Sequence, residues 1–442
     1  MLSRRFFVVL ALLLAACGGK VNPPPPVSRL DVDANPLCLG RSSSTTVEVR
    51  IARTTAFTGA VTVRADPVAG LTMDPVTIPP SSDRARITIR TTADAPPGPA
   101  TLKLRAGDVV ATVVVEIGAA EGGTRDKSFG VDGTVTVPLS FEGSFVVLAF
   151  QAESLLVSVT HDAGSASKSR LMRVRSNGTL DEGFGDPITH SIEDRPAFAL
   201  GVRSDGRFLL GDASGHPTYR EYSANGTPNG VQGISAQSFW TYPLAMHEMP
   251  DGSMLVSGFV YAGGASAYVQ RNRPDGSLDP TFSSPIEFGN PTPGGSFRAD
   301  GASVMATFNG LISYKSNGAL AFHTDTGTTY TAAEWTPDGN IVAAGKELVM
   351  FDDSGEKLST IEGVKLSSSA LWVAVRRDRS IVALTETELM TVTPEGSVKG
   401  RALTKAQLPE RRRLVLDACG RAVTAESTIE PEQSLLLRRY WP

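Results

Sequence analysis

No strong charge of either sign marks this sequence: 42 Lys and Arg residues stand against 46 Asp and Glu residues, and the formal net charge is −4. Neither a basic field nor an acidic block is present, which argues against nucleic acid as a partner. Helix-period stretches are also missing after the first sixteen residues, whereas the chain has 43 glycines and 29 prolines. Few helices and many turns predict an all-β protein.

Local catalytic motifs are missing as well. The sequence contains no Gly-x-Ser-x-Gly elbow and no phosphate-binding loop. Its five histidines are scattered, and no two have the i, i+4 spacing of a helical zinc site: His161, His190, His216, His247 and His323. We therefore predict no catalytic residue, no metal and no cofactor. An enzyme stays open, because a site assembled from several loops leaves no such motif.

The chain begins with a targeting segment, MLSRRFFVVLALLLAAC, in which two arginines precede an apolar run. The run covers residues 6–16 and is too short to cross a bilayer as a permanent helix. The Leu-Ala-Ala-Cys box at its end resembles that of a bacterial lipoprotein signal peptide. This resemblance implies a signal peptide at 1–16 and lipidation of Cys17. The alternative is a plain secretory signal cut near Ala16.

The residues after the lipidation site add two expectations. Gly18 stands where an acidic residue would indicate inner-membrane retention, so the resemblance implies the outer membrane, facing either the periplasm or the cell surface. Pro23–Pro26 favour polyproline II and predict a stiff tether at 17–27. We therefore expect a monomeric protein whose membrane contact is the lipid on Cys17.

Two cysteines remain, Cys38 and Cys419, in a chain expected to be exported to a compartment where thiols oxidise. They either form a disulfide that ties the first domain to the end of the chain or remain two buried thiols in separate domains. The sequence favours the second interpretation.

Residues 28–118 show the alternation of strands that have one solvated face, as in TTVEVRI (45–51) and ARITIR (85–90). About seven strands in this length predict a β-sandwich. The phrases FTGAVTV and DAPPGPATLKLRA resemble bacterial immunoglobulin-like (Ig-like) modules, which implies a spacer or an adhesive unit.

A different pattern begins near residue 124, where apolar strands alternate with turns that end in glycine. One series of turns has its glycines 37 to 50 residues apart: Gly178, Gly226, Gly276, Gly318, Gly355 and Gly396. A second series interleaves with it, in Asp205-Gly206, Asp251-Gly252, Asp300-Gly301, Asp338-Gly339, Asp378-Arg379 and Cys419-Gly420. Asn-Gly and Asp-Gly accept positive φ at both turn centres, so each pair predicts a tight hairpin.

Each repeat therefore contains four strands, which is the pattern of one propeller blade. Counting a degraded first copy near Glu153, the sequence predicts a seven-bladed β-propeller at 124–442. The last blade lacks its fourth strand, while the region opens with an unmatched strand at 133–137. We expect this N-terminal strand to complete the last blade and close the ring, leaving no bare edge.

The phrases NGTLDEGF (177–184) and DGSLDPTF (275–282) are the same corner in two blades, and DKSF (126–129) is a third copy. Leu180-Asp181 followed by Phe184-Gly185 resembles the delta-60 repeat of bacterial β-propellers. The resemblance covers roughly 124–442, with its clearest motifs in the first half, and it implies no reaction.

Propellers bind ligands most often at the mouth of the central channel, on the face that carries the longer loops. The residues of these loops that could hold a ligand are His161, Arg195, His216, Trp240, Tyr242 and Tyr261. We expect a non-enzymatic, envelope-anchored lipoprotein that presents a propeller to a protein or a glycan. The alternative is a periplasmic propeller hydrolase or lyase that acts on a polysaccharide.

Overall fold

The structure, a computed structural model, shows an all-β protein, as expected. It describes residues 26–33, 37–55, 57–121, 123–139, 143, 145–161, 168–185, 197–212, 218–233, 240–261, 264–282, 287–289, 291–361, 364, 366, 371–394, 396–403, 412–428 and 433–442. No helix occurs in these residues, and none of them forms a segment fit to cross a membrane as a helix. The predicted signal peptide, Cys17 and the proline tether lie outside the described residues.

Residues 27–121 form two sheets, which we call the sandwich. One sheet has the order β1-β3-β7-β5, with bounds Val27–Val32, Ser44–Arg53, Arg84–Thr91 and Leu71–Met73. The other has the order β2-β9-β8-β4-β6, with bounds Leu37–Arg41, Val109–Glu121, Gly98–Ala106, Val61–Ala65 and Val76–Ile78. Alternate residues of both sheets, such as Val49, Ile87, Leu104 and Val113, meet in one buried core.

Seven further sheets are formed by the described residues from 134 onward, and we number them by their innermost strands. Sheet 1 contains β11 (Phe145–Gln151), β12 (Ser154–His161) and β13 (Lys168–Val174). Sheet 2 contains β14 (Ala197–Val202), β15 (Phe208–Asp212), β16 (Thr218–Tyr222) and β17 (Pro228–Gly233). Sheet 3 contains β18 (Trp240–Glu248), β19 (Met254–Tyr261), β20 (Ala265–Asn272) and β21 (Glu287–Phe288).

The second half of the region repeats this arrangement. Sheet 4 contains β22 (Pro291–Phe297), β23 (Ser303–Thr307), β24 (Gly310–Tyr314) and β25 (Leu320–Asp325). Sheet 5 contains β26 (Ala332–Trp335), β27 (Ile341–Ala344), β28 (Leu348–Phe351) and β29 (Lys357–Thr360). Sheet 6 contains β30 (Trp372–Val375), β31 (Ile381–Leu384), β32 (Glu388–Val392) and β33 (Val398–Ala402). Sheet 7 contains β34 (Arg413–Leu416), β35 (Ala422–Thr428), β36 (Ser434–Tyr440) and β10 (Thr134–Pro138).

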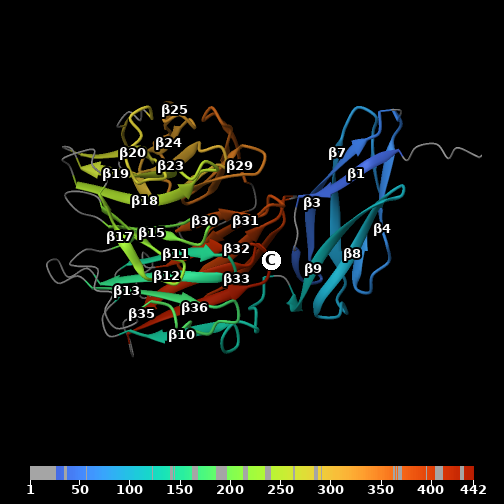
Figure 1. Cartoon of the computed structure of the whole chain (residues 1–442), viewed down its shortest axis with the longest axis horizontal. Coiled ribbons are helices and arrows are strands. Elements are labelled where there is room, and N and C mark those ends of the chain that lie inside the picture. Colours follow the sequence, from blue (N-terminus) through green and yellow to red (C-terminus); the bar gives the residue numbers. More distant parts are fainter. Residues whose placement is uncertain are drawn as a thin grey trace, which may run out of the picture.

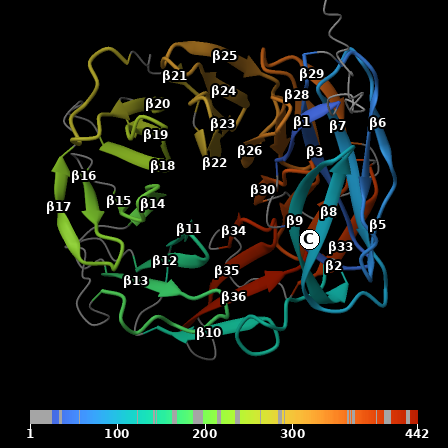
Figure 2. The same ribbon diagram turned by 45° about the vertical axis from the view of Figure 1, so that its right-hand side comes forward.

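The seven sheets surround a common axis (Figure 2). Each innermost strand contacts the innermost strand of the next sheet, and β34 of sheet 7 contacts β11 of sheet 1. Separate apolar cores fill the spaces between neighbouring sheets, for example the one around Phe208 and Tyr222 between sheets 1 and 2. We call this part of the chain the ring.

The strand near the start of the ring completes its last sheet, as the sequence indicated. β10 runs antiparallel to β36, with Val135 opposite Leu437 and Val137 opposite Leu435. All four of these side chains are buried in the same apolar core. Sheet 7 is therefore built from two segments of the chain nearly 300 residues apart.

The turns differ from the expectation in one respect. In the described turns of both series, φ is positive at the glycine but not at the Asn or Asp before it. In the turn at 175–179, for instance, the Gly178 amide donates to Arg175 O while the Arg175 amide donates to Thr179 O. This is a type I turn followed by a left-handed residue, in which the side chain of Asn177 accepts the Thr179 amide instead. Arg379 takes the glycine position in one turn, with φ of 71°.

The repeated phrase forms a corner in which an arginine of the third strand binds the aspartate of the phrase. In sheet 7, Arg439 Nε donates to Asp126 Oδ2 at 2.8 Å, and its guanidinium lies 4.6 Å from the centre of the Phe129 ring. Both charged side chains are buried, with 4% and 1% of their surface exposed. The next residue, Gly130, donates its amide to Asn177 O in sheet 1. The corner therefore joins two sheets.

The same corner recurs in sheet 1. Arg173 binds Asp181 and stacks on Phe184 at 4.5 Å, and the Gly185 amide donates to Asn225 O in sheet 2. Hydrogen bonds from Arg173, and then from Arg175, lower the pKa of Asp181. In sheet 3 the corner is looser, because Asp279 lies 3.9 Å from Arg271 and 3.6 Å from Arg273. The repetition in the sequence thus reflects a repeated contact between sheets.

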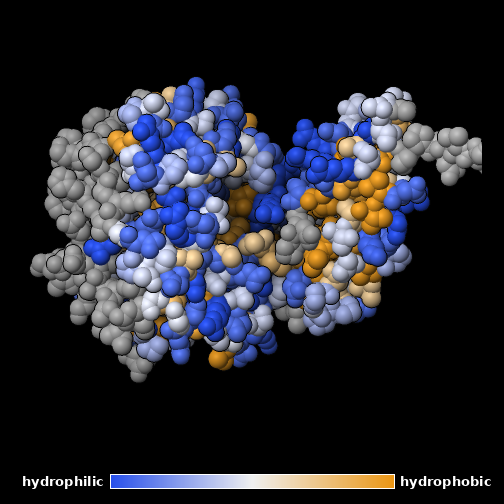
Figure 3. All heavy atoms as spheres, in the orientation of Figure 1, coloured by the Kyte–Doolittle hydropathy of each residue, from blue (hydrophilic) through white to orange (hydrophobic). Residues whose placement is uncertain are grey.

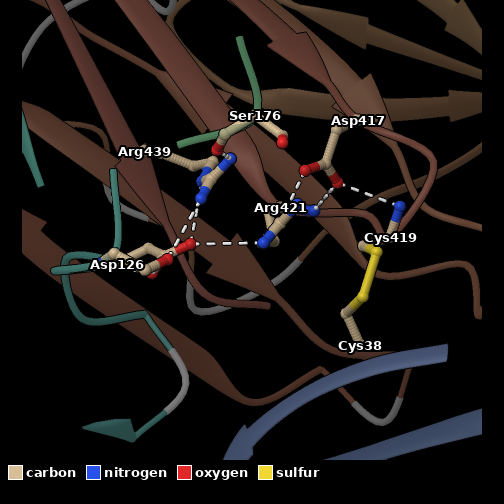
Figure 4. The surroundings of a disulfide bond; sticks show 8 residues. Cys38, Asp126, Ser176, Asp417, Cys419, Arg421 and Arg439 are labelled. Carbon is tan, nitrogen blue, oxygen red and sulfur yellow. Dashed lines mark hydrogen bonds and ion pairs between the residues drawn. A yellow bond between two sulfur atoms is a disulfide. The ribbon is translucent and has the colours of Figure 1, made fainter. Parts of the chain in front are cut away.

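Cys38 of β2 and Cys419 form a disulfide, so the interpretation of two separate thiols is wrong. Cys419 lies in the turn between β34 and β35, which places the sandwich against the side of the ring that carries these turns (Figure 1). We call this side the hairpin face and the opposite side the loop face. Arg421 connects the disulfide turn to the closing corner, because it binds both Asp417 and Asp126 (Figure 4).

Closure of the ring can be tested at Arg439. Replacement by Met leaves the buried Asp126 with one longer ion pair, to Arg421 at 3.3 Å, so Arg439→Met should lower the free energy of unfolding by about 3 kcal/mol. Arg379→Met is the matched control, since its partly exposed pair with Asp338 also lies in the ring and should contribute about 0–1 kcal/mol. Urea unfolding can be followed by tryptophan fluorescence, because all four tryptophans lie in the region of the ring, from Trp240 to Trp441. Equal losses in the two variants would contradict the assigned role.

Candidate functional site

The structure describes only part of the predicted ligand-binding set. Arg195 and His216 lie outside the described residues. Trp240 and Tyr261 face each other across β18 and β19, although their side chains are not described. His161 ends β12 opposite Lys168, and Tyr242 lies two residues into β18. Four of the six predicted residues therefore lie in sheets 1 and 3, at the strand ends on the loop face.

Tyr242 belongs to an aromatic row that crosses three sheets. Phe198 of β14 is its centre, with ring centres 4.7 Å from Phe145 of β11 and 5.3 Å from Tyr242. Tyr242 in turn stacks on Phe259 of β19 at 4.6 Å and an interplanar angle of 13°. All four side chains are half-buried.

The row lies on the loop face. Phe145 is the first residue of β11, Phe198 the second of β14, and Tyr242 the third of β18. Each innermost strand ends at its turn on the hairpin face, so these three residues stand at the opposite end. The aromatic row is therefore directed away from the sandwich.

A cavity of about 340 Å³ occupies the ring axis beside sheets 5, 6 and 7. Its lining comes from β26, β30 and β34, together with Phe150 of β11 and the small residues Gly294 and Gly295 of β22. The lining is mostly apolar. Trp372 stands at the loop-face end of β30, where the guanidinium of Arg413 lies 4.9 Å from the centre of its ring.

Glu334 is the single carboxyl group among the described residues that line this axial cavity. Burial raises its pKa from 4.5 to about 8, and hydrogen bonds from the Ser296 side chain and the Trp335 backbone offset only part of this effect. The raised pKa favours the protonated form of Glu334, which can donate a hydrogen bond. The sequence analysis missed it, although an acidic residue in the apolar stretch Ala332–Trp335 was a detectable signal.

The axial cavity and the aromatic row offer mostly apolar contact surface. Glycoside hydrolysis uses two carboxyl groups on opposite sides of the scissile bond, and the described lining provides one. No group of three or more His, Cys, Asp or Glu side chains that could hold a metal occurs in the described parts of the chain. Half-buried aromatic rings beside an apolar cavity provide flat contact surface with little conformational freedom to lose.

Comparisons with known proteins support the propeller. Residues 250–282 match the sequence model of a family described as a domain of unknown function (DUF5122) beta-propeller. The region that forms the ring is a β-propeller, as the repeats predicted. A search of the curated proteins finds no significant match.

Several solved structures resemble the chain at low identity. The Dos1 propeller has a TM-score of 0.46 at 9% identity, covering 67% of this chain and 78% of that one. A Hadza microbial sialidase has 0.40 at 11%, covering 93% and 99%. A gluconolactonase from Xanthomonas campestris has 0.35 at 14%, covering 73% and 99%. Similarity this low does not indicate a shared activity.

The protonation of Glu334 should be visible in the stability of the protein. Because the folded pKa is raised, its proton stabilises the fold fully below about pH 4.5, and this contribution is lost as the pH rises to about 8. Glu334→Gln is neutral at every pH. The difference in melting temperature between this variant and the wild type should therefore shift in favour of the variant as the pH rises from about 4.5 to about 8, and it should stay constant at higher pH. Glu347→Gln, at an exposed site, is the control. A difference from wild type that is equal at about pH 5 and about pH 9 would contradict the assignment.

Proposed function

We propose that this chain is a lipid-anchored envelope protein whose seven-bladed propeller binds a glycan on its loop face. The aromatic row of Phe145, Phe198, Tyr242 and Phe259 is the observation that carries the proposal. Aromatic rings pack against the apolar faces of sugar rings, and a row across three sheets offers contact to several consecutive sugar units. An extended oligosaccharide fits this geometry better than a single small molecule.

The rest of the molecule supports presentation rather than catalysis. The sandwich, which we infer to be an Ig-like module, lies on the hairpin face, on the side of the ring opposite the aromatic row. The signal at 1–16 would direct export, and the lipid on Cys17 and the tether at 17–27 would then hold both domains at the outer membrane. A polysaccharide hydrolase or lyase is the second candidate, and it is favoured only by the raised pKa of Glu334.

Glycan binding can be measured by affinity electrophoresis of the full chain in gels that contain defined polysaccharides. Phe198→Ala removes the centre of the row and should weaken retardation about tenfold, since each aromatic pair contributes roughly 0.5–1.5 kcal/mol beyond its buried area. Phe57→Ala is the control, because Phe57 is also half-buried but lies in the sandwich and is not part of the row.

Three results would count against glycan binding at the row. The first is retardation of the wild type by no polysaccharide, and the second is an equal loss in both variants. The third is retardation that Phe198→Ala leaves unchanged although the variant is folded. Release of new reducing ends by the wild type would support the hydrolase, provided that Glu334→Gln abolishes it.

Anchoring is tested separately. Cells that express the chain and grow with labelled palmitate should incorporate the label into the wild type and not into Cys17→Ser, because the thiol is the acceptor atom. Cys38→Ser serves as the matched control and should be labelled like the wild type. Equal labelling of the wild type and Cys17→Ser would overturn the anchor while leaving glycan binding untouched.

A further inference from the structure

A second cavity, of about 300 Å³, lies between the sandwich and the hairpin face of the ring. Figure 3 shows the hollow between the two domains. Thr45 and Cys38 contribute to its lining from the sandwich, and the turns of sheets 6 and 7 contribute from the ring. A smaller cavity of about 130 Å³ adjoins it and shares Arg376, Asp378 and Thr45.

Arg376 is the buried charge common to both cavities. It begins the turn between β30 and β31, and only 7% of its surface is exposed. Its Nε donates to Gly420 O at 2.8 Å, and Nη1 makes a long hydrogen bond of 3.4 Å to Ser380 Oγ. The remaining nitrogen, Nη2, has no hydrogen-bond partner among the described residues. A guanidinium has five donors, so this one is poorly satisfied for its depth.

In the equivalent turns of two other sheets, the arginine at this position has a carboxylate partner. Arg298, in the turn between β22 and β23, binds Asp300 through two hydrogen bonds of 2.9 and 2.6 Å. Arg203, between β14 and β15, lies 3.4 Å from Glu221 and 3.7 Å from Glu248. Within the described parts of the chain, Arg376 has no carboxylate at ion-pair distance.

Asp378, the aspartate expected to pair with Arg376, has other hydrogen-bond partners. Asp378 has the same position in its turn as Asp300, but its Oδ1 accepts the amide and the hydroxyl of Ser380. Its Oδ2 accepts the hydroxyl of Thr45 from the sandwich at 3.3 Å. Asp378 therefore contacts the sandwich through Thr45 and forms no ion pair with Arg376.

Two other carboxylates line the cavity, Asp33 and Asp417, and both have partners. Asp33 accepts the Glu48 amide at 3.0 Å. Asp417 accepts the amides of Cys419 and Arg421 and forms an ion pair of 2.6 Å with the Arg421 side chain. Burial lowers the pKa of Arg376 to about 10, although Asp378 and Asp417 both pull it upward. Their combined field therefore does not offset the cost of burying this charge.

We propose that the cavity between the sandwich and the ring is a binding site for a small oxyanion, held by the free Nη2 group of Arg376. A carboxylate or phosphate oxygen would take the place that Asp300 occupies beside Arg298, and a charge-assisted hydrogen bond would satisfy the unpaired donor. The volume admits a small anion together with water. Arg377, whose side chain is exposed, also lines the cavity and adds a second positive charge to it.

The test uses the full chain in detergent at constant ionic strength, with inorganic phosphate and acetate as separate probes. A ligand that binds only the folded protein raises the melting temperature in a saturable way. We expect such a rise with at least one probe, and the probe that acts distinguishes a tetrahedral from a planar oxyanion. Arg376→Met should abolish the rise, whereas Arg298→Met should retain it.

Arg376→Lys decides the question if Arg376→Met does not fold. A lysine keeps the charge but loses the planar fork, so the midpoint concentration of the probe should increase about tenfold. The proposal is overturned if neither probe acts on the wild type, or if the Arg376 variant that folds responds like the wild type. Loss of the response in folded Arg298→Met would also overturn it, because the anion would then not depend on the unpaired arginine.

Discussion

The closed ring depends on one non-local contact, the pairing of β10 with β36 and the buried corner that accompanies it. Strand pairing alone would leave the two ends of a long chain joined by five opposed residue pairs. The ion pair between Arg439 and Asp126 adds a contact that is satisfied only when the ends meet, because Asp126 precedes β10 and Arg439 lies in β36. An unpaired Asp126 would be costly at this depth, so the partly closed states are destabilised. The axis and its cavity exist only in the closed state.

The corner also explains why the repeat is clear in some sheets and faint in others. Arginine, aspartate and phenylalanine act together in sheets 1 and 7, where the arginine both binds the carboxylate and stacks on the ring. Sheet 3 keeps the residue types at longer ion-pair distances. Sheet 5 instead relies on an apolar core around Ile341 and Phe351. A sheet that packs through apolar contacts does not need the polar corner, so its sequence is free to diverge from the repeat.

The sequence predicted most of the ring because its signal is local. Glycines such as Gly178 and Gly206 are required by φ of 85° in their turns, and the apolar strands between them show on inspection. The disulfide was one of two alternatives and the less favoured one, because no local feature of Cys38 or Cys419 indicates how the two domains dock. Of the aromatic row, the sequence predicted only Tyr242. Phe145 and Phe198 have the pattern of ordinary strand residues, and the contact between their rings depends on the angle between the sheets.

The two faces of the ring are under different physical constraints. On the hairpin face each turn is short and needs a residue with positive φ, so the sequence has little freedom there. On this face, turns of sheets 6 and 7 lie against the sandwich, joined to it by the Cys38–Cys419 bond and by the hydrogen bond between Thr45 and Asp378. On the loop face the innermost strands begin, and the longer connections can vary without disturbing the sheets. Recognition of a ligand is therefore most easily built there, where the aromatic row lies and where the sandwich leaves the ring uncovered.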